Sequence, residues 1–319
     1  MSRPFQIPQL HGVSRNIHIF DGHGAYLGGN LSGGYQNDPP QLTTAMFCEM
    51  CDHFLRFESR RTSWYLYALG NDNTIGERVS RDNAYLRPGK YAVLSRSGRP
   101  LGVHVTDEQP IRRVLTPQPP SSRLRANQAH FRDTLQRRDG GCVITGRRGS
   151  PEEPWLGMIA AHIYPVSRLT SWNQNGYSRW VTDTTDPRLI APNGLFSAQN
   201  GLLLDSTTHS FFDRFKVAHG HKVVVFTRDS QQVGGRVLSP TTRPSRDRNL
   251  TVSDDLLRWH FHQAILTNMK GSGERQWDLD YAGGDPMNII LAHEDAGDIM
   301  EAELATRLGA YAGETVPAE

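Results

Sequence analysis

The alternation of apolar and polar positions in the first third of the chain predicts a small α+β unit. Apolar residues recur at helical spacing through positions 42–57, which indicates one helix with a buried face. Cys48 and Cys51 lie on that face and are predicted to be core residues. Shorter alternating segments, separated by turns rich in Gly, Asn, Asp and Pro, read as strands of a mixed or mostly antiparallel sheet. The predicted strands are 16–20, 64–69, 77–80, 91–95 and 101–105.

A proline-rich stretch divides the chain into two parts. Residues 108–122 contain four prolines, which is typical of a linker. The sequence therefore predicts an N-terminal unit at 1–107, a linker at 108–122, a second unit at 123–230 and a helical extension at 231–319 packed on that second unit.

The second unit combines helices with a short apolar strand. A helix is predicted at about 124–138, and an apolar strand at 156–163. Asp205 and Ser206 can begin a further short helix, because their side-chain oxygens accept hydrogen bonds from the free N–H groups of a first turn. The unit is thus α+β with flanking helices.

The extension begins with a strongly amphipathic helix at 254–270. It carries His260 and His262, which are two positions apart and therefore point to different faces of the helix. The two histidines make a poor pair of metal ligands for each other.

Composition describes a soluble globular protein of the cell interior. Apolar residues make up 37% of the chain and charged residues 21%. No apolar run approaches the ~18 residues of a membrane span, and the N-terminus lacks a signal-peptide core. Three cysteines are too few for a disulfide framework. We expect an intracellular protein, cytoplasmic or nuclear, without a membrane partner.

Net charge is only +2, but the arginines are unevenly distributed. Seven arginines lie between positions 123 and 148, against two aspartates. They are Arg123, Arg125, Arg132, Arg137, Arg138, Arg147 and Arg148. Such a cluster either neutralises nucleic-acid phosphates or forms an ordinary solvated helix face, and the sequence leaves both interpretations open.

Three short motifs carry the candidate chemistry. Cys-x-x-Thr-Gly occupies positions 142–146, and Ala-Ala-His ends at His162. Asn200 precedes His209 by nine positions, and Asp213 follows His209 by four. Residues four apart on a helix share a face, so an imidazole and a carboxylate could reach one cation there.

These motifs, in this order and spacing, resemble the HNH endonuclease family, the ββα-metal finger, and within it the branch found in many uncharacterised fungal proteins. The resemblance covers roughly residues 125–230. It implies a ββα-metal core following the N-terminal sheet unit. It further implies that His162 is the general base, that Asn200 holds the loop of His162 and orients its ring, and that His209 and Asp213 bind a divalent metal.

One position departs from the family pattern. The residue before the general base is a metal-binding His or Asp in well-studied members, and here it is Ala161. Mg²⁺ is the first expectation for the ion, because it often binds through one or two side chains plus water and phosphate; Mn²⁺, Zn²⁺ and Ni²⁺ also suit the donors. In a second interpretation His162 is itself a ligand and the base is lost.

The resemblance implies a metal-dependent endonuclease that hydrolyses phosphodiester bonds in nucleic acid. Arg147 or Arg214 would contact substrate phosphate. A long insertion between His162 and Asn200 carries aromatic residues, among them Trp172, that either stack on substrate or form a local hydrophobic plug.

Two other functions fit the same residues. The pocket could instead serve an isomerase or cyclase acting on a small molecule in biosynthesis, or the unit could bind nucleic acid without cleaving it. Taken singly, each site residue also has a purely structural reading. His162 could be a core histidine, and His209 with Asp213 an ordinary polar helix face.

Overall fold

The computed structural model describes residues 7, 15–31, 42–59, 62–111, 122–219, 222–227, 229, 231–244 and 246–271. Most of the linker, and the extension beyond residue 271, lie outside the described residues. Within them the chain is α+β, as the sequence predicts: a five-stranded N-terminal sheet is followed by small hairpins and helices. None of the described helices is long and apolar enough to pass through a bilayer.

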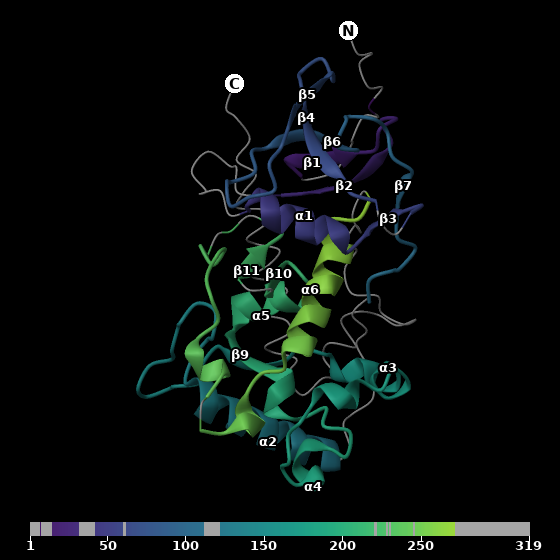
Figure 1. The fold of residues 1–319 in the computed structure, drawn as a ribbon. Coiled ribbons are helices and arrows are strands. Elements are labelled where there is room, and N and C mark those ends of the chain that lie inside the picture. Colours follow the sequence, from purple (N-terminus) through teal and green to yellow (C-terminus); the bar gives the residue numbers. More distant parts are fainter. Residues whose placement is uncertain are drawn as a thin grey trace, which may run out of the picture.

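The N-terminal sheet has the strand order β2-β1-β6-β4-β5. Its strands are β1 (Ile17–Phe20), β2 (Tyr26–Asn30), β4 (Tyr65–Leu69), β5 (Ile75–Arg78) and β6 (Gly89–Leu94). Strand β1 pairs with β6 in parallel, and the other neighbours are antiparallel, so the sheet is mixed. Helix α1 (Thr44–Asp52) lies under it, with Phe47 and Met50 fully buried (Figure 1).

The predicted helix at 42–57 is only half right. Helix α1 ends at Asp52, and the chain then forms strand β3 (Leu55–Phe57), which pairs with β7 (Val103–Val105). Leu55 lies opposite Val105, so pairing with a distant strand overrides the local helical pattern at this end. Cys48 and Cys51 are buried free thiols, as predicted.

The second part of the chain is built on one hairpin between helices. Helix α2 (Ser122–Asp139) packs across β8 (Met158–His162) and β9 (Gly201–Asp205), which pair antiparallel. Helix α5 (Ser206–Asp213) follows β9 directly, and the hairpin of β10 (Val217–His219) and β11 (Val223–Val225) follows α5. Between β8 and β9 the chain forms the short helices α3 (Leu169–Gln174) and α4 (Pro187–Ile190).

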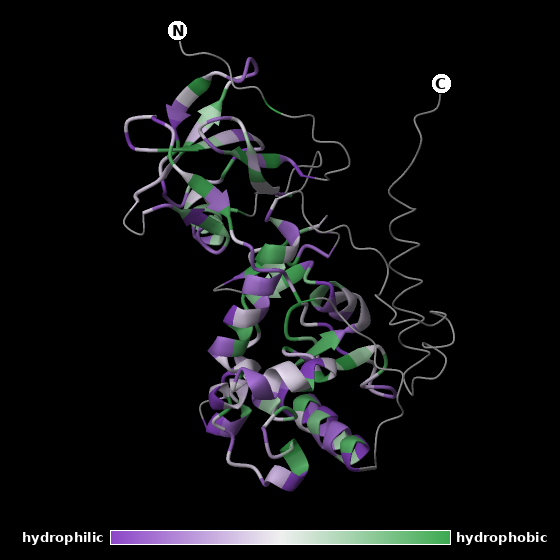
Figure 2. Cartoon of the chain, turned by 90° about the vertical axis from the view of Figure 1, so that its right-hand side faces the viewer, coloured by the Kyte–Doolittle hydropathy of each residue, from purple (hydrophilic) through white to green (hydrophobic). Residues whose placement is uncertain are grey.

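Two hydrophobic cores share helix α6 (Asp254–Asn268). Its first half contributes Leu256 and Trp259 to the core around the β8–β9 hairpin. Its second half contributes Ile265 and Leu266 to the core under the N-terminal sheet, where they join Phe47 of α1. Figure 1 shows α6 running from the lower lobe up to α1, and the same two lobes are visible from the side (Figure 2).

The contact between α6 and the N-terminal sheet also includes backbone hydrogen bonds. Gly29 N–H donates to the carbonyl of Met269, and Gly271 N–H donates to the carbonyl of Leu27. The Arg15 guanidinium, which lies beside β1, donates to the carbonyl of Gly271. The described part of the extension thus packs on both units, whereas the sequence predicted packing on the second unit.

Candidate functional site

The candidate site lies where β8, β9 and α5 meet. His162 ends β8 and lies opposite Gly201, the first residue of β9, while Met158 lies opposite Asp205 at the other end of the hairpin. Because α5 begins immediately after Asp205, two strands and one helix form a compact ββα unit. This arrangement brings His162 of β8 toward His209 and Asp213 of α5.

The start of α5 is fixed by the Cys-x-x-Thr-Gly motif. Asp205 Oδ1 accepts a hydrogen bond from Thr208 N–H at 2.9 Å, and Asp205 Oδ2 accepts one from the Thr145 hydroxyl at 2.8 Å. Burial alone would raise the pKa of Asp205, but hydrogen bonds from Thr208, Cys142 and Thr145 together lower it. A charged carboxylate therefore caps the helix as predicted, and Cys142 and Thr145 act as its supports. Residues 142–146 form a turn.

His209 and Asp213 lie one helical turn apart on α5. The distance from His209 Nε2 to Asp213 Oδ2 is 3.3 Å, and each side chain is 18% exposed. The two side chains thus contact each other and are largely shielded from water. This is the separation at which one ion can contact both groups.

His162 is held between aromatic rings. Its imidazole stacks on Phe131 of α2 with 3.9 Å between ring centroids and 12° between planes, and Phe196 meets it edge-on at 5.3 Å. Its Nε2 is buried and has no hydrogen-bond partner among the described residues. Sequence reasoning missed Phe131 and Phe196, because an aromatic residue on a predicted apolar face looks like any other core residue.

The imidazole of His162 is neutral at physiological pH. Burial lowers its pKa to about 3; the negative charge of Asp213 raises the value and the charge of His209 lowers it, both by less than burial does. The ring as a whole is partly exposed, but Nε2 is closed off from water. A neutral imidazole has a free lone pair and is able to accept a proton.

Asn200 holds the loop that follows His162. Its side-chain carbonyl accepts a hydrogen bond from Tyr164 N–H at 2.8 Å, and its amide donates to the carbonyls of Tyr164 and Leu195. The residue is fully buried. Both amide protons are used on the backbone, so Asn200 positions His162 through the chain, and the two phenylalanines, rather than the amide, contact the ring.

A buried ion pair fixes β9 to the end of α2. Arg138 and Asp139 form two parallel hydrogen bonds of 2.6 and 2.7 Å, and their side chains are 1% and 0% exposed. Arg138 also donates to the carbonyls of Ala198 and Gly201, and Asp139 accepts from Leu203 N–H. Arg138 is therefore a structural residue, and it fits neither interpretation of the arginine cluster, contact with phosphate or a solvated helix face.

The other arginines of that cluster are exposed, but those on α2 do not form one stripe. Arg125 and Arg132 are seven positions apart and share one flank of the helix, while Arg123 and Arg137 lie on the other flank. Arg147 is exposed on the turn that follows Gly146. Arg214 is half-buried at the C-cap of α5, directly after Asp213.

Trp172 lies in the hydrophobic core. Its side chain is fully buried, its Nε1–H donates to the carbonyl of Asn193, and its ring packs against Tyr164 at 5.1 Å. An indole in this position cannot contact substrate. The hydrophobic-plug interpretation of the insertion therefore holds for Trp172.

A methyl group added at Gly201 is expected to destabilise the protein by about 1–3 kcal/mol. The Cβ of Gly201→Ala would lie 2.4 Å from Phe131 Cζ and 2.7 Å from Leu135 Cδ1, so α2 would have to move away from His162. Urea denaturation measures the loss. Gly70→Ala is the control, because the atom nearest its added methyl is the exposed side-chain tip of Asp72. Equal stability of the two variants would contradict the prediction.

Acid is expected to destabilise the protein through two buried histidines. Burial lowers the pKa of His260 to about 4, as it lowers that of His162 to about 3. Below about pH 6.5 the unfolded chain binds protons that the folded chain does not, so stability falls as pH falls, by about 1.4 kcal/mol per unit for each histidine. Urea midpoints between pH 7.5 and 5 measure this slope.

His260→Gln tests the contribution of one of these histidines. The substitution is expected to reduce the pH dependence of the unfolding free energy by the contribution of one proton, because glutamine does not titrate. Glutamine keeps a donor for the carbonyl of Phe212, which His260 Nε2 contacts at 3.0 Å. His104→Gln, at an exposed position, serves as the control. Midpoints that do not change over this pH range would contradict the assignment.

Only part of a metal site is present in the protein. Among the described residues no group of three or more His, Cys, Asp or Glu side chains is arranged to hold an ion. Ala161 is 1% exposed and belongs to the core, so position 161 supplies no third donor. His209 and Asp213 fit a hard cation that completes its shell with water and phosphate, and they do not fit a closed four-ligand zinc site.

Comparison with known proteins finds one family similar to part of this chain. No curated protein and no solved structure gives a significant match to the chain. Residues 142–218 match the family model described as HNH endonuclease, and this range contains His162, Asn200, His209 and Asp213. The family resemblance predicted from the three motifs is thereby confirmed for residues 142–218.

Proposed function

We propose that this protein is a metal-dependent nuclease that hydrolyses phosphodiester bonds in nucleic acid. The observation that supports it best is the neutral His162, whose buried Nε2 has no described partner and which interacts electrostatically with both His209 and Asp213. A buried acceptor without a partner is rare in folded proteins and commonly marks a functional position.

His162 acts as the general base in this proposal. The attacking water gives its proton to the imidazole of His162, whose ring is partly exposed. Phe131 and Phe196 keep the ring in one orientation, so the proton transfer requires no rearrangement of the imidazole. Asn200 keeps the loop after His162 in place through Tyr164.

His209 and Asp213 hold the divalent ion. When bound, the ion would stabilise the negative charge that develops on the phosphate oxygens. The two protein donors leave most of the coordination shell open for water and substrate, which favours Mg²⁺ or Mn²⁺. Exposed Arg147, and Arg214 beside Asp213, are positioned to attract the phosphate backbone.

A plasmid-nicking assay with Mg²⁺, Mn²⁺ and Ni²⁺ tests the function. Metal-dependent nicking is expected, and His209→Ala and Asp213→Asn should each require far more metal for the same rate. His104→Ala, an exposed histidine of the N-terminal unit, is the matched control and should behave like the parent protein. Single-stranded and double-stranded DNA and RNA are compared in parallel.

Two outcomes would overturn the proposal. Salt-sensitive binding of nucleic acid without cleavage under any metal would instead indicate a binding module. If the folded protein neither binds nor cleaves nucleic acid, a small-molecule substrate becomes the better interpretation. The burial of Trp172 removes one contact expected with such a substrate.

A further inference from the structure

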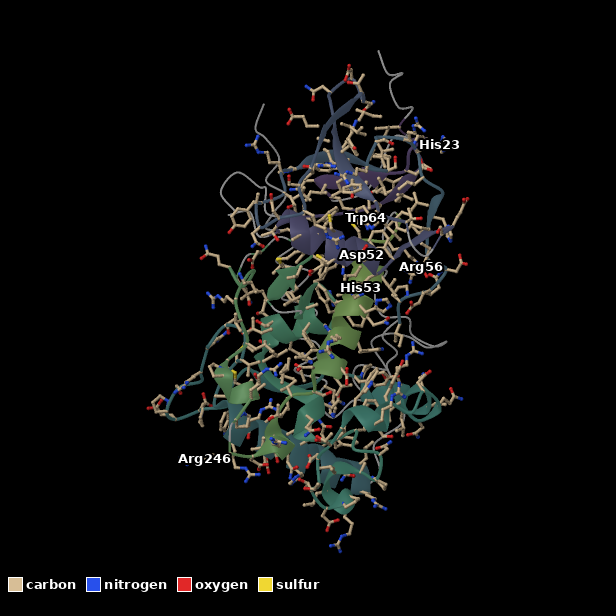
Figure 3. The ribbon with its side chains drawn as sticks, in the orientation of Figure 1. His23, Asp52, His53, Arg56, Trp64 and Arg246 are labelled. Carbon is tan, nitrogen blue, oxygen red and sulfur yellow. The ribbon has the colours of Figure 1, made fainter. Side chains whose placement is uncertain are left out.

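A second pair of histidines lies far from the candidate site, where the N-terminal unit meets α6. His53 is the C-cap of α1, and His262 lies in the middle of α6, so they are 209 positions apart in the chain. Their Nδ1 atoms are 2.9 Å apart and their ring centroids 5.2 Å apart. Figure 3 shows His53 at this junction, with Asp52 and Arg56 close by.

Hydrogen bonding determines where the protons of this pair lie. His262 Nε2 is 2.9 Å from Glu108 Oε1, and a carboxylate oxygen accepts, so Nε2 carries the proton. In the neutral ring, Nδ1 of His262 then holds a lone pair that points at His53. Metal-ligating histidines typically have this arrangement: one ring nitrogen donates to a carboxylate, as Nε2 does here, and the other, here Nδ1, keeps a lone pair for the metal.

The surroundings hold both rings in place. Phe261 meets the His53 ring edge-on at 5.9 Å, and Lys270 Nζ donates to the backbone carbonyl of Glu108. Burial is the main cause that lowers the pKa of His53; the charges of His262 and Arg56 lower it further, whereas Asp52 and Glu108 raise it. A neutral imidazole is the form that binds metal.

We propose that His53 and His262 form a two-imidazole site for a divalent transition ion such as Zn²⁺, Ni²⁺ or Cu²⁺, with Glu108 as the outer carboxylate. Metal–nitrogen bonds of about 2.0–2.1 Å place two ligand nitrogens about 3 Å apart, so the observed separation needs little change. On binding, His53 transfers its proton from Nδ1 to Nε2, and both Nδ1 lone pairs face the ion.

Water completes the coordination of this ion. Asp52 cannot serve as a third ligand in the present arrangement, because its carboxylate binds the Trp64 indole and the Arg81 guanidinium. The described residues offer no other third donor here. Imidazole donors prefer borderline transition ions to Mg²⁺, so this site selects a different ion from the pair His209 and Asp213.

Calorimetric titration of the untagged protein with Ni²⁺ and with Zn²⁺ tests the inference. The titration is done on the His209→Ala variant, the background protein, in which the pair on α5 is lost. Metal binding at the proposed nuclease site, whether real or not, then does not contribute to the result. One ion per chain is expected. His53→Ala and His262→Ala should each abolish binding, and Glu108→Gln should weaken it by about tenfold or more.

Two controls separate a site from general histidine affinity. His104→Ala, at an exposed position, should leave binding unchanged. Ni²⁺ should raise the unfolding temperature of the background protein and should not raise that of the folded His53→Ala variant. Binding that survives in the double variant His53→Ala/His262→Ala, or no binding by the background protein, would reduce the pair to a hydrogen bond and overturn the inference.

Discussion

Replacing His162 with alanine is expected to lower the single-turnover rate of phosphodiester cleavage by about 10²- to 10⁴-fold, the usual contribution of a general base. The metal requirement should be little changed, because His209 and Asp213 remain on α5. The substitution removes the only imidazole in contact with both Phe131 and Phe196 among the described residues, so no neighbouring side chain can replace it as the base.

The comparison with Phe131→Leu makes this test specific. That variant keeps His162 but removes the ring that lies flat against it at 3.9 Å, so a smaller loss of rate is expected, again without a change in metal requirement. Circular dichroism and urea denaturation establish that both variants fold. A loss below about tenfold in His162→Ala would contradict the assignment of the base.

Arg138→Met is expected to destabilise the protein by about 3–5 kcal/mol, because it leaves the carboxylate of Asp139 buried without its partner. The carbonyls of Ala198 and Gly201 also lose their donor. Urea denaturation measures the free energy of unfolding. Gly201 lies opposite His162, so the nuclease rate should fall together with stability.

Two further variants define the mechanism of this loss. Arg188→Met removes the exposed pair Arg188–Asp186, in which the arginine side chain is 83% exposed, and should cost far less stability than Arg138→Met because water screens the pair. The double variant Arg138→Met/Asp139→Leu should lose less unfolding free energy than the sum of the losses in Arg138→Met and Asp139→Leu. The reason is that no unpaired charge remains in the double variant. Losses that simply add would show that the buried pair is not coupled.

The sequence identifies the candidate site residues more readily than the residues that support them. The spacing of His162, Asn200, His209 and Asp213 could be read directly, because a helix places residues four apart on one face. The rings that hold His162 could not, since Phe131 follows the ordinary pattern of a buried helix face. Arg138 was misassigned for a similar reason: an arginine buried by its neighbour Asp139 looks like any charged helix residue.

The fold was predictable where local pattern and tertiary contacts agree. Strands β1, β4, β5 and β6 of the N-terminal sheet followed from alternation and turns, whereas strand β2 was not predicted and the helix at 42–57 was predicted too long. Strand β3 forms because Leu55 pairs with Val105, fifty positions away, and periodicity cannot report such a partner. The pairing of His53 with His262 lies beyond local pattern for the same reason, so only His260 was considered as a partner of His262.

The position of α6 has a consequence for how the protein reaches its native state. Both cores need this helix, and it is the last described element in the chain. During synthesis, the N-terminal sheet leaves the ribosome long before Ile265 and Leu266 can cover the side of α1 that carries Phe47. The nascent chain therefore exposes an apolar surface until α6 is complete, and α6 then fills both cores.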